Sequence, residues 1–129
     1  MAQGRFYMTP TALNTIRKVG RDTAREWGKA QANKYHTELR KGCQECADSY
    51  KSFPAREDYV GAVNLSLHHV GHHYIAFRPI GDNEVTIAGV LYEGVDIPNR
   101  LKELQSMTQQ EIAVITASTK KEDLGGSIQ

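Results

Sequence analysis

Residues 29–50 read KAQANKYHTELRKGCQECADSY and carry the clearest periodicity in the chain. Small or apolar side chains recur there at intervals near 3.6 residues, at Ala32, Tyr35, Leu39, Gly42, Cys43, Cys46 and Tyr50. That interval is typical of one face of an amphipathic helix. The sequence therefore predicts a long helix in this region, with one side packed in a core.

A second helix is predicted just before it. Thr9 is suited to cap a helix, and Pro10 fits the first helical position because no N–H is needed there. Apolar or small residues then follow at spacings of three and four, and Trp27-Gly28 interrupts the pattern before residue 29. Because the break between the two helices is so short, we expect an antiparallel helical hairpin.

Period-two alternation, typical of half-buried strands, follows the hairpin. Strands are predicted near residues 63–70, 73–78 and 85–91, with a hairpin turn over residues 79–83. Residues 5–8 form a further strand candidate before the first helix. This order predicts an α+β fold, in which an N-terminal strand and a three-stranded antiparallel meander complete one sheet covered by the hairpin.

The C-terminal part of the chain is predicted to hold one or two short helices. Asp96 or Asn99 is placed to cap a helix through Leu104, and Thr108 with Glu111 matches a capping box. Residues from 118 onward are polar and glycine-rich, so we expect a frayed tail. We divide the chain into one domain, residues 1–107, and a C-terminal extension, residues 108–129.

Composition is that of an ordinary globular protein, with 129 residues, 40% hydrophobic and 24% charged. The longest apolar run, residues 87–92, is too short to cross a bilayer. Residues 1–60 hold 11 Lys/Arg against 7 Asp/Glu, whereas residues 61–129 hold 5 against 8. The front half is therefore basic, and such a surface attracts an acidic partner or a phosphate backbone. A solvated helix face is the alternative explanation.

The two cysteines, Cys43 and Cys46, form a C-x-x-C motif in the middle of the predicted second helix. Redox pairs of this type lie at a helix N-terminus, and zinc sites usually add a second pair. Both cysteines continue the apolar stripe, so we expect them to pack in the core. The first residues are not followed by an apolar signal region, and we expect a cytoplasmic, reducing location.

Four of the five histidines fall within six residues, at His68, His69, His72 and His73. Neutral imidazoles can bind a metal or act as an acid/base pair on RNA. Neighbours on a strand point to opposite faces, so only some of the four can converge. No nearby Cys, Asp or Glu completes a ligand set, so a structural or solvent-exposed role is favoured. We expect no metal ion and no cofactor.

Four motifs in order resemble the ParE/RelE superfamily of bacterial toxins. The string Tyr7-Met-Thr9 before the first helix resembles the family's opening, and residues 27–39 resemble its second helix, with a Trp-Gly pair and a later Tyr and Leu. Residues 72–78 resemble its third strand, and residues 90–96 resemble its closing motif. The resemblance covers residues 6–104 and is closer to the ParE branch; it also suggests that Trp27 is packed at the hairpin corner.

The resemblance implies a toxin of a type II toxin–antitoxin system, of the kind that serves plasmid stabilisation. A ParE-like member is expected to inhibit DNA gyrase by binding it and to be neutralised by a cognate antitoxin protein. We expect the partner-binding residues to be basic, namely Arg17, Lys18, Arg21, Arg25 and Arg78.

Two alternatives remain. A RelE-like ribonuclease would cut mRNA on the ribosome, and its candidate catalytic residues here are His73, Arg78 and Tyr92. That set looks incomplete, because residues 60–77 contain no Lys or Arg to stabilise a phosphorane. A non-toxic family member acting as an interaction module is the third possibility.

Overall fold

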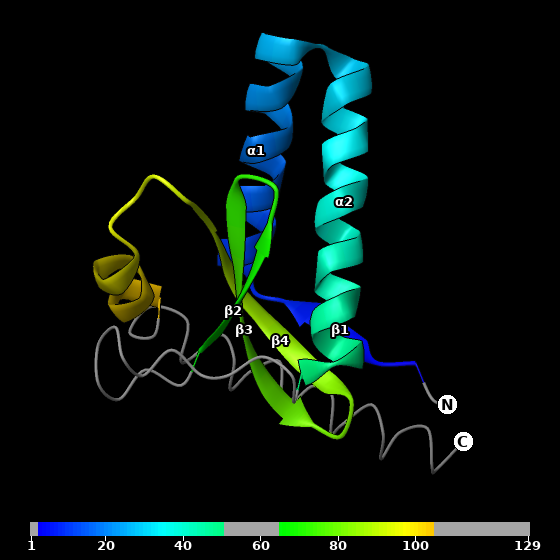
Figure 1. The fold of residues 1–129 in the computed structure, drawn as a ribbon, viewed down its shortest axis with the longest axis vertical. Coiled ribbons are helices and arrows are strands. Elements are labelled where there is room, and N and C mark those ends of the chain that lie inside the picture. The colour runs from blue at the N-terminus through cyan, green and yellow to red at the C-terminus, as the bar shows by residue number, and fades with distance from the viewer. Residues whose placement is uncertain (1–2, 51–64, 105–129) are drawn as a thin grey trace.

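The computed structural model describes residues 3–50 and 65–104. The elements in chain order are β1 (Arg5–Met8), α1 (Pro10–Trp27), α2 (Lys29–Asp48), β2 (Ser66–Val70), β3 (His73–Gly81) and β4 (Glu84–Tyr92). Residues 97–104 are helical and follow β4. Figure 1 shows the hairpin of α1 and α2 standing beside the twisted sheet, with helical residues 97–104 on the other side. The predicted α+β order is confirmed.

The four strands form one sheet in the order β1-β4-β3-β2. β2, β3 and β4 are antiparallel neighbours, as a meander requires, whereas β1 pairs in parallel with β4. β1 and β2 therefore lie at the two edges. The turn after β3 is shorter than the predicted residues 79–83, because β3 continues to Gly81. A register shift between Pro79 and Gly81 accommodates the proline, which has no N–H for the ladder.

Thr9 fixes where α1 begins. Its hydroxyl accepts the Ala12 N–H at 3.0 Å and donates to the Ala88 carbonyl of β4, also at 3.0 Å. One buried side chain thus caps the helix and ties it to the central strand. At the far end of α1, Gly28 has φ +95° and separates the two helices. Both predicted boundaries are confirmed.

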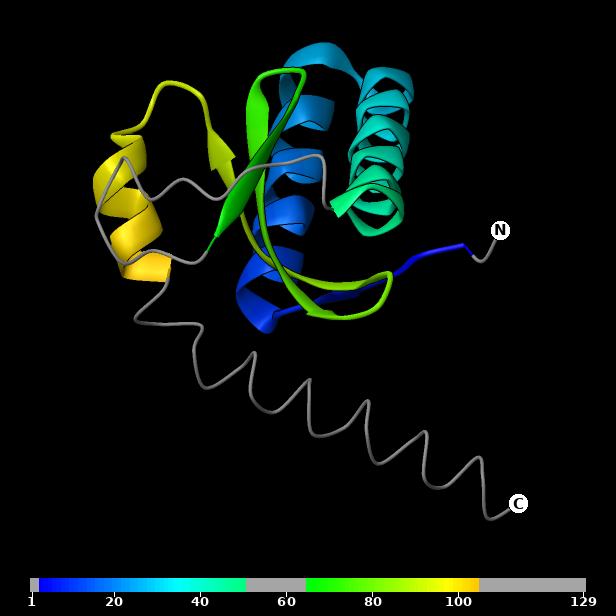
Figure 2. The same cartoon turned by 60° about the horizontal axis from the view of Figure 1, so that its bottom comes forward.

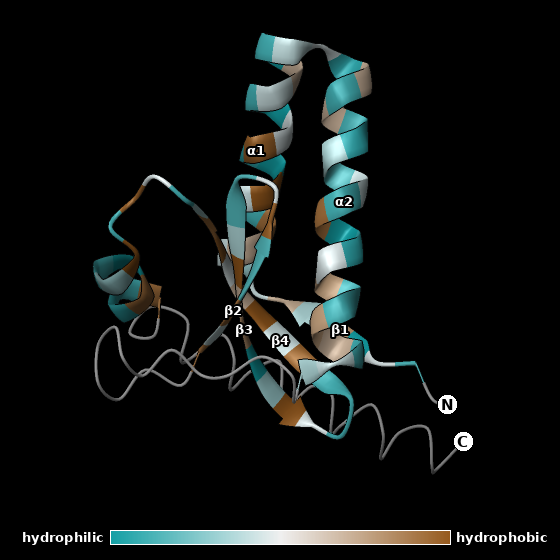
Figure 3. Ribbon diagram, viewed as in Figure 1, coloured by the Kyte–Doolittle hydropathy of each residue, from teal (hydrophilic) through white to brown (hydrophobic). Residues whose placement is uncertain are grey.

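Two apolar clusters pack on opposite faces of the sheet. On one face, residues of α1 and α2, including Ala12, Cys43 and Cys46, pack against Phe77 and Ile87. On the other face, Leu101 and Leu104 pack against the strands, together with Leu65, Leu67, Ala76, Ala88 and Leu91. The sheet is therefore the middle layer of three, as the rotated view in Figure 2 also shows. Figure 3 places strongly hydrophobic segments along the strands, whereas the hairpin tip is mostly hydrophilic.

The cysteines are core residues, as predicted. Both thiols are fully buried on the α2 face that meets the sheet. Burial raises the pKa of Cys43 to about 12 and raises that of Cys46 as well. Both thiols therefore stay protonated at neutral pH, which does not fit a redox role. The predicted capping box at residues 108–111 and the extension 108–129 lie outside the described residues.

Candidate partner-binding surface

The α1 basic residues are defined as Arg17, Lys18, Arg21 and Arg25, and all four are exposed. The three arginines follow one another at intervals of four, so they share one side of the helix. Lys18 donates to the Asp22 carboxylate at 3.0 Å, and both side chains are largely exposed. α1 therefore presents an arginine stripe to solvent, beside a weak surface ion pair.

Arg78 does not join this stripe. It follows Phe77 on β3, and Phe77 packs against the cysteines of the hairpin. Since side chains alternate along a strand, Arg78 belongs to the opposite sheet face, where Ile80 also packs. The predicted set of five cations is thus divided between two sides of the molecule.

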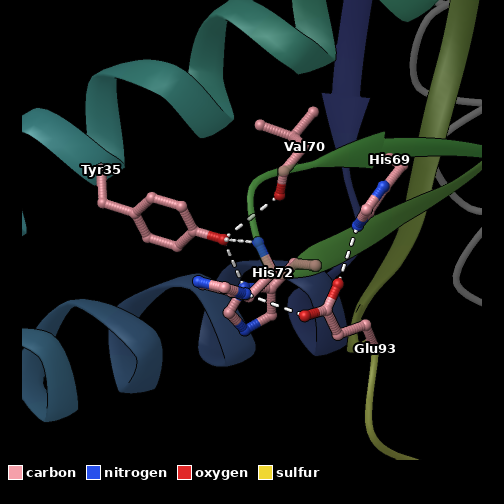
Figure 4. Close-up of polar contacts among 6 residues, drawn as sticks. Tyr35, His69, Val70, His72 and Glu93 are labelled. Atoms are coloured by element: carbon pink, nitrogen blue, oxygen red, sulfur yellow. Dashed lines mark hydrogen bonds and ion pairs between the residues drawn. The ribbon is translucent and has the colours of Figure 1, made fainter.

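The four clustered histidines are divided into separate contacts. His69 lies on β2 and His72 in the following turn, and both meet Glu93, which follows β4 (Figure 4). The nitrogen–oxygen distances are 3.0 Å for His69 and 2.8 Å for His72. These hydrogen bonds, from His72 first and then His69, lower the pKa of Glu93. His68 instead approaches Glu45 of α2, at 3.4 Å.

Glu93 is a partner of the histidines that the sequence analysis did not predict. The fold brings Glu93 between His69 and His72 from more than 20 residues away. Each of the two carboxylate oxygens of Glu93 forms a hydrogen bond with a different histidine. The polar groups of the three side chains are therefore paired with one another. Within residues 3–50 and 65–104, no group of three or more His, Cys, Asp or Glu side chains is arranged to hold a metal ion.

Tyr35 of α2 forms the second polar centre of this region, and sequence reasoning assigned it only to the apolar stripe. Its hydroxyl lies 2.5 Å from Nδ1 of His73 and 3.2 Å from the Val70 carbonyl, and it accepts the His72 N–H at 3.1 Å (Figure 4). Burial raises the pKa of Tyr35 and lowers that of His73. His73 is therefore favoured as a neutral imidazole, whose Nδ1 is able to accept a hydrogen bond from the Tyr35 hydroxyl.

A groove of about 660 Å³ runs between α1, the end of β4 and helical residues 97–104. Side chains that line it include Thr15, Val19, Trp27, Tyr92 and Leu104. Trp27 is 69% exposed and Tyr92 is 54% exposed, so two large aromatic side chains face solvent at one groove. The expectation that Trp27 is packed at the hairpin corner is wrong. As the last residue of α1, it lies at the hairpin tip, where the sheet does not reach (Figure 1).

Comparison with known proteins gives the family. Residues 6–96 match the model of the ParE toxin of type II toxin–antitoxin systems, parDE. The chain belongs to the ParE toxin family. It is also 27% identical over 96 residues to Toxin ParE of Escherichia coli, a match that covers 74% of this chain and 91% of that protein.

A solved structure described as the chromosomal ParDE TA system from P. aeruginosa has the same fold. The TM-score is 0.59 at 12% identity, and the match covers 70% of this chain and 96% of that chain. The family match ends at residue 96, before helical residues 97–104. This protein is therefore a ParE-type toxin of a type II toxin–antitoxin system, built on a fold that is preserved at low sequence identity.

Against this ParE background, the three candidate ribonuclease residues are only partly assembled. His73 and Tyr92 are register partners on β3 and β4, with ring centroids 5.7 Å apart. Arg78 lies five residues further along β3, about 16 Å from His73 at the usual rise of a strand. A cation that stabilises a phosphorane must lie close to the reacting phosphate. The fold brings together an imidazole and a phenol, without Arg78.

No helix among the residues that the structure describes is long and apolar enough to cross a membrane.

Proposed function

We propose that this ParE-type toxin inhibits DNA gyrase by binding it, with no catalytic centre of its own, and acts in the cytoplasm. The match to the ParE toxin family over residues 6–96 carries this proposal. The exposed aromatic pair, Trp27 and Tyr92, supports it, because aromatic side chains are the usual anchors of protein interfaces. The arginine stripe of α1 adds a surface that attracts acidic groups.

The proposal includes neutralisation by a cognate antitoxin. β1 and β2 are the edge strands of the sheet, and an edge strand offers unpaired backbone groups to an added strand. An initially disordered antitoxin segment is able to wrap such an edge and the basic hairpin at the same time. The α1 basic residues supply electrostatic attraction for an acidic segment.

One observation favours the ribonuclease alternative. His73 and Tyr92 lie together at the edge of the groove, and burial lowers the pKa of His73, which favours the neutral form that a general base requires. The position of Arg78 argues against the ribonuclease alternative, because no cation from Arg78 would lie beside His73 and Tyr92 to stabilise the charge on the reacting phosphate. We therefore keep gyrase binding as the proposed function and ribosome-dependent mRNA cleavage as the alternative.

A plasmid supercoiling assay with gyrase, run beside an in vitro translation assay, separates the two functions. Poisoned gyrase yields linear DNA, whereas a ribonuclease yields cut message. We expect linear DNA and intact message. Cut message with intact plasmid would establish the alternative, and neither product would indicate a non-toxic interaction module.

The variants His73→Ala and Tyr92→Phe sharpen the assay. Loss of a proton-transfer group from a ribonuclease costs about 10²–10⁴-fold in rate. Loss of a single non-anchor contact in a broad interface costs about tenfold or less. We expect both variants to retain gyrase inhibition within about tenfold, with antitoxin binding as the check that they fold.

Arg78→Ala is the third variant, because its cation lies on a sheet face away from the α1 stripe. Lys34→Ala on α2 removes an exposed cation outside the proposed surface and serves as the matched control. A larger loss for Arg78→Ala than for Lys34→Ala is expected if Arg78 contacts gyrase. Equal, small losses would remove Arg78 from the binding surface.

A further inference from the structure

The arginine stripe of α1, formed by Arg17, Arg21 and Arg25, has guanidinium groups that are available to an external anion. Within the part of the chain that the structure describes, none of the three forms a hydrogen bond or an ion pair. The nearby carboxylate of Asp22 is instead hydrogen-bonded by Lys18 at 3.0 Å. That hydrogen bond is the main cause of the lowered pKa of Asp22, and the charges of Arg25 and Arg21 lower it further.

We propose that the arginine stripe binds the phosphate backbone of duplex DNA. Successive arginines are four residues apart, which is about 6 Å along the helix axis at 1.5 Å per residue. Each strand of duplex DNA carries one phosphate per about 3.4 Å of its axis. The arginine interval therefore matches about every second phosphate of a strand that lies alongside α1. A guanidinium group binds two phosphate oxygens at once, which a lysine ammonium does not.

The composition of the surface favours a nucleic acid backbone over a folded protein. From position 17 to position 25, the exposed residues of α1 are four cations and one carboxylate, and none of them is apolar. A protein interface is centred on apolar or aromatic anchors that lose their water, whereas DNA phosphates are bound mainly by arginine, lysine and polar groups. The hairpin also extends past the sheet, so a duplex is able to approach α1 without contacting the strands (Figure 1).

DNA binding by the stripe is independent of base sequence, because phosphate contacts position a protein without reading the bases. It is a property of the free toxin and does not depend on gyrase. In a complex of toxin, gyrase and DNA, the stripe would add a second contact, and only that step rests on the proposed function. An antitoxin segment that covers the hairpin would compete with DNA for the same arginines.

Fluorescence anisotropy of a labelled duplex of about 20 base pairs, with no gyrase present, measures this binding directly. The wild type is compared with Arg17→Gln/Arg21→Gln/Arg25→Gln in NaCl from about 50 to about 200 mM. Three phosphate contacts contribute about −2.7 to the slope of log K against log salt, which is a loss of about 40-fold in affinity over this range. We expect the slope of the arginine variant to be less steep by about 2.7, and two duplexes of unrelated sequence to bind the wild type equally.

Lys34→Gln/Lys41→Gln/Lys102→Gln is the matched control, because it removes the same three charges from exposed positions outside the stripe. We expect this variant to keep the wild-type slope, Asp22→Asn to bind DNA more tightly, and thermal unfolding to confirm that all variants are folded. Equal slopes for the wild type and the arginine variant would overturn the proposal. An equal change in the lysine variant would also overturn it, since binding would then follow net charge alone. Displacement of the duplex by polyglutamate at an equal concentration of negative charge would instead identify the stripe as a site for acidic polypeptides, and would likewise overturn the proposal.

Discussion

Removing one oxygen atom, in the variant Tyr35→Phe, tests whether the Tyr35 hydroxyl holds α2 to the turn between β2 and β3. That hydroxyl accepts the His72 N–H and lies within hydrogen-bond distance of the Val70 carbonyl and His73 Nδ1. Gly71 fits the same place: its φ is +59°, and an added Cβ would lie 2.6 Å from Cε1 of the Tyr35 ring. The phenylalanine ring keeps this packing and loses only the polar contacts.

The expected loss follows from the number of hydrogen bonds. A phenol has one proton, so Tyr35 donates to either His73 or Val70 and accepts from His72, which makes two hydrogen bonds at a time. Each contributes about 0.5–1.5 kcal/mol net, so the free energy of unfolding should fall by about 1–3 kcal/mol. Because burial raises the pKa of Tyr35, the phenol stays protonated at the pH of the measurement and its ionisation does not contribute.

Urea unfolding at pH 7.5 measures this loss, with Tyr92→Phe as the control. Tyr92 is 54% exposed, so its substitution should change the free energy of unfolding by less than about 0.5 kcal/mol. The pKa of His73, followed by NMR, should rise in Tyr35→Phe, because the donor that favours the neutral imidazole is gone. A loss equal to that of Tyr92→Phe, with an unchanged His73 pKa, would refute the role of the hydroxyl.

Three further predictions concern the core, the basic surface and pH. Cys43→Ala/Cys46→Ala should lower the free energy of unfolding by about 1–3 kcal/mol through lost packing, with toxicity per folded molecule unchanged. The native thiols should resist iodoacetamide at pH 8; alkylation without unfolding would contradict their structural role. Reversing the charges of all four α1 basic residues should weaken the antitoxin complex most at low salt, and equal affinity there would contradict the electrostatic contribution. Burial lowers the pKa of His73, so as pH falls below about 6.5 the imidazole is protonated in the unfolded chain before it is protonated in the folded protein. The free energy of unfolding should therefore decrease from pH 7 towards pH 5, and it should decrease less in His73→Gln.

Local sequence signals predicted most of the fold. The cap at Thr9, the break at Gly28 and the 3.6-residue stripe of α2 each depend on residues within one or two turns. Such signals are readable without knowing what lies opposite in space. The second covered face of the sheet was harder to predict. Residues 85–91 of β4 are all buried, because the strand is central and both of its faces are covered, whereas simple alternation predicts one solvated face.

The candidate site was less predictable, since its contacts join residues far apart in sequence. Tyr35 meets His73 across 38 residues, and Glu93 meets His72 across 21. Helical periodicity correctly placed Tyr35 towards the core but gave no indication of its hydroxyl partners. The alternation of side chains along a strand did predict that only some of the four histidines would converge. Which of them share a partner depends on the position of Glu93, which the local sequence does not give.

The exposure of Trp27 follows from a mismatch between the lengths of the hairpin and the sheet. Near the sheet, α1 and α2 bury Ala12, Cys43 and Cys46 against the strands, whereas towards the tip the helices rely on each other, with Ile16, Ala32 and Leu39 buried between them. An apolar residue at the very tip has no strand beneath it. The contacts that stabilise the hairpin against the strands thus lie near the sheet, and the tip of the hairpin stays exposed for contact with a partner. Because the folded core does not depend on covering Trp27, a partner is able to bind and leave that surface without unfolding the protein.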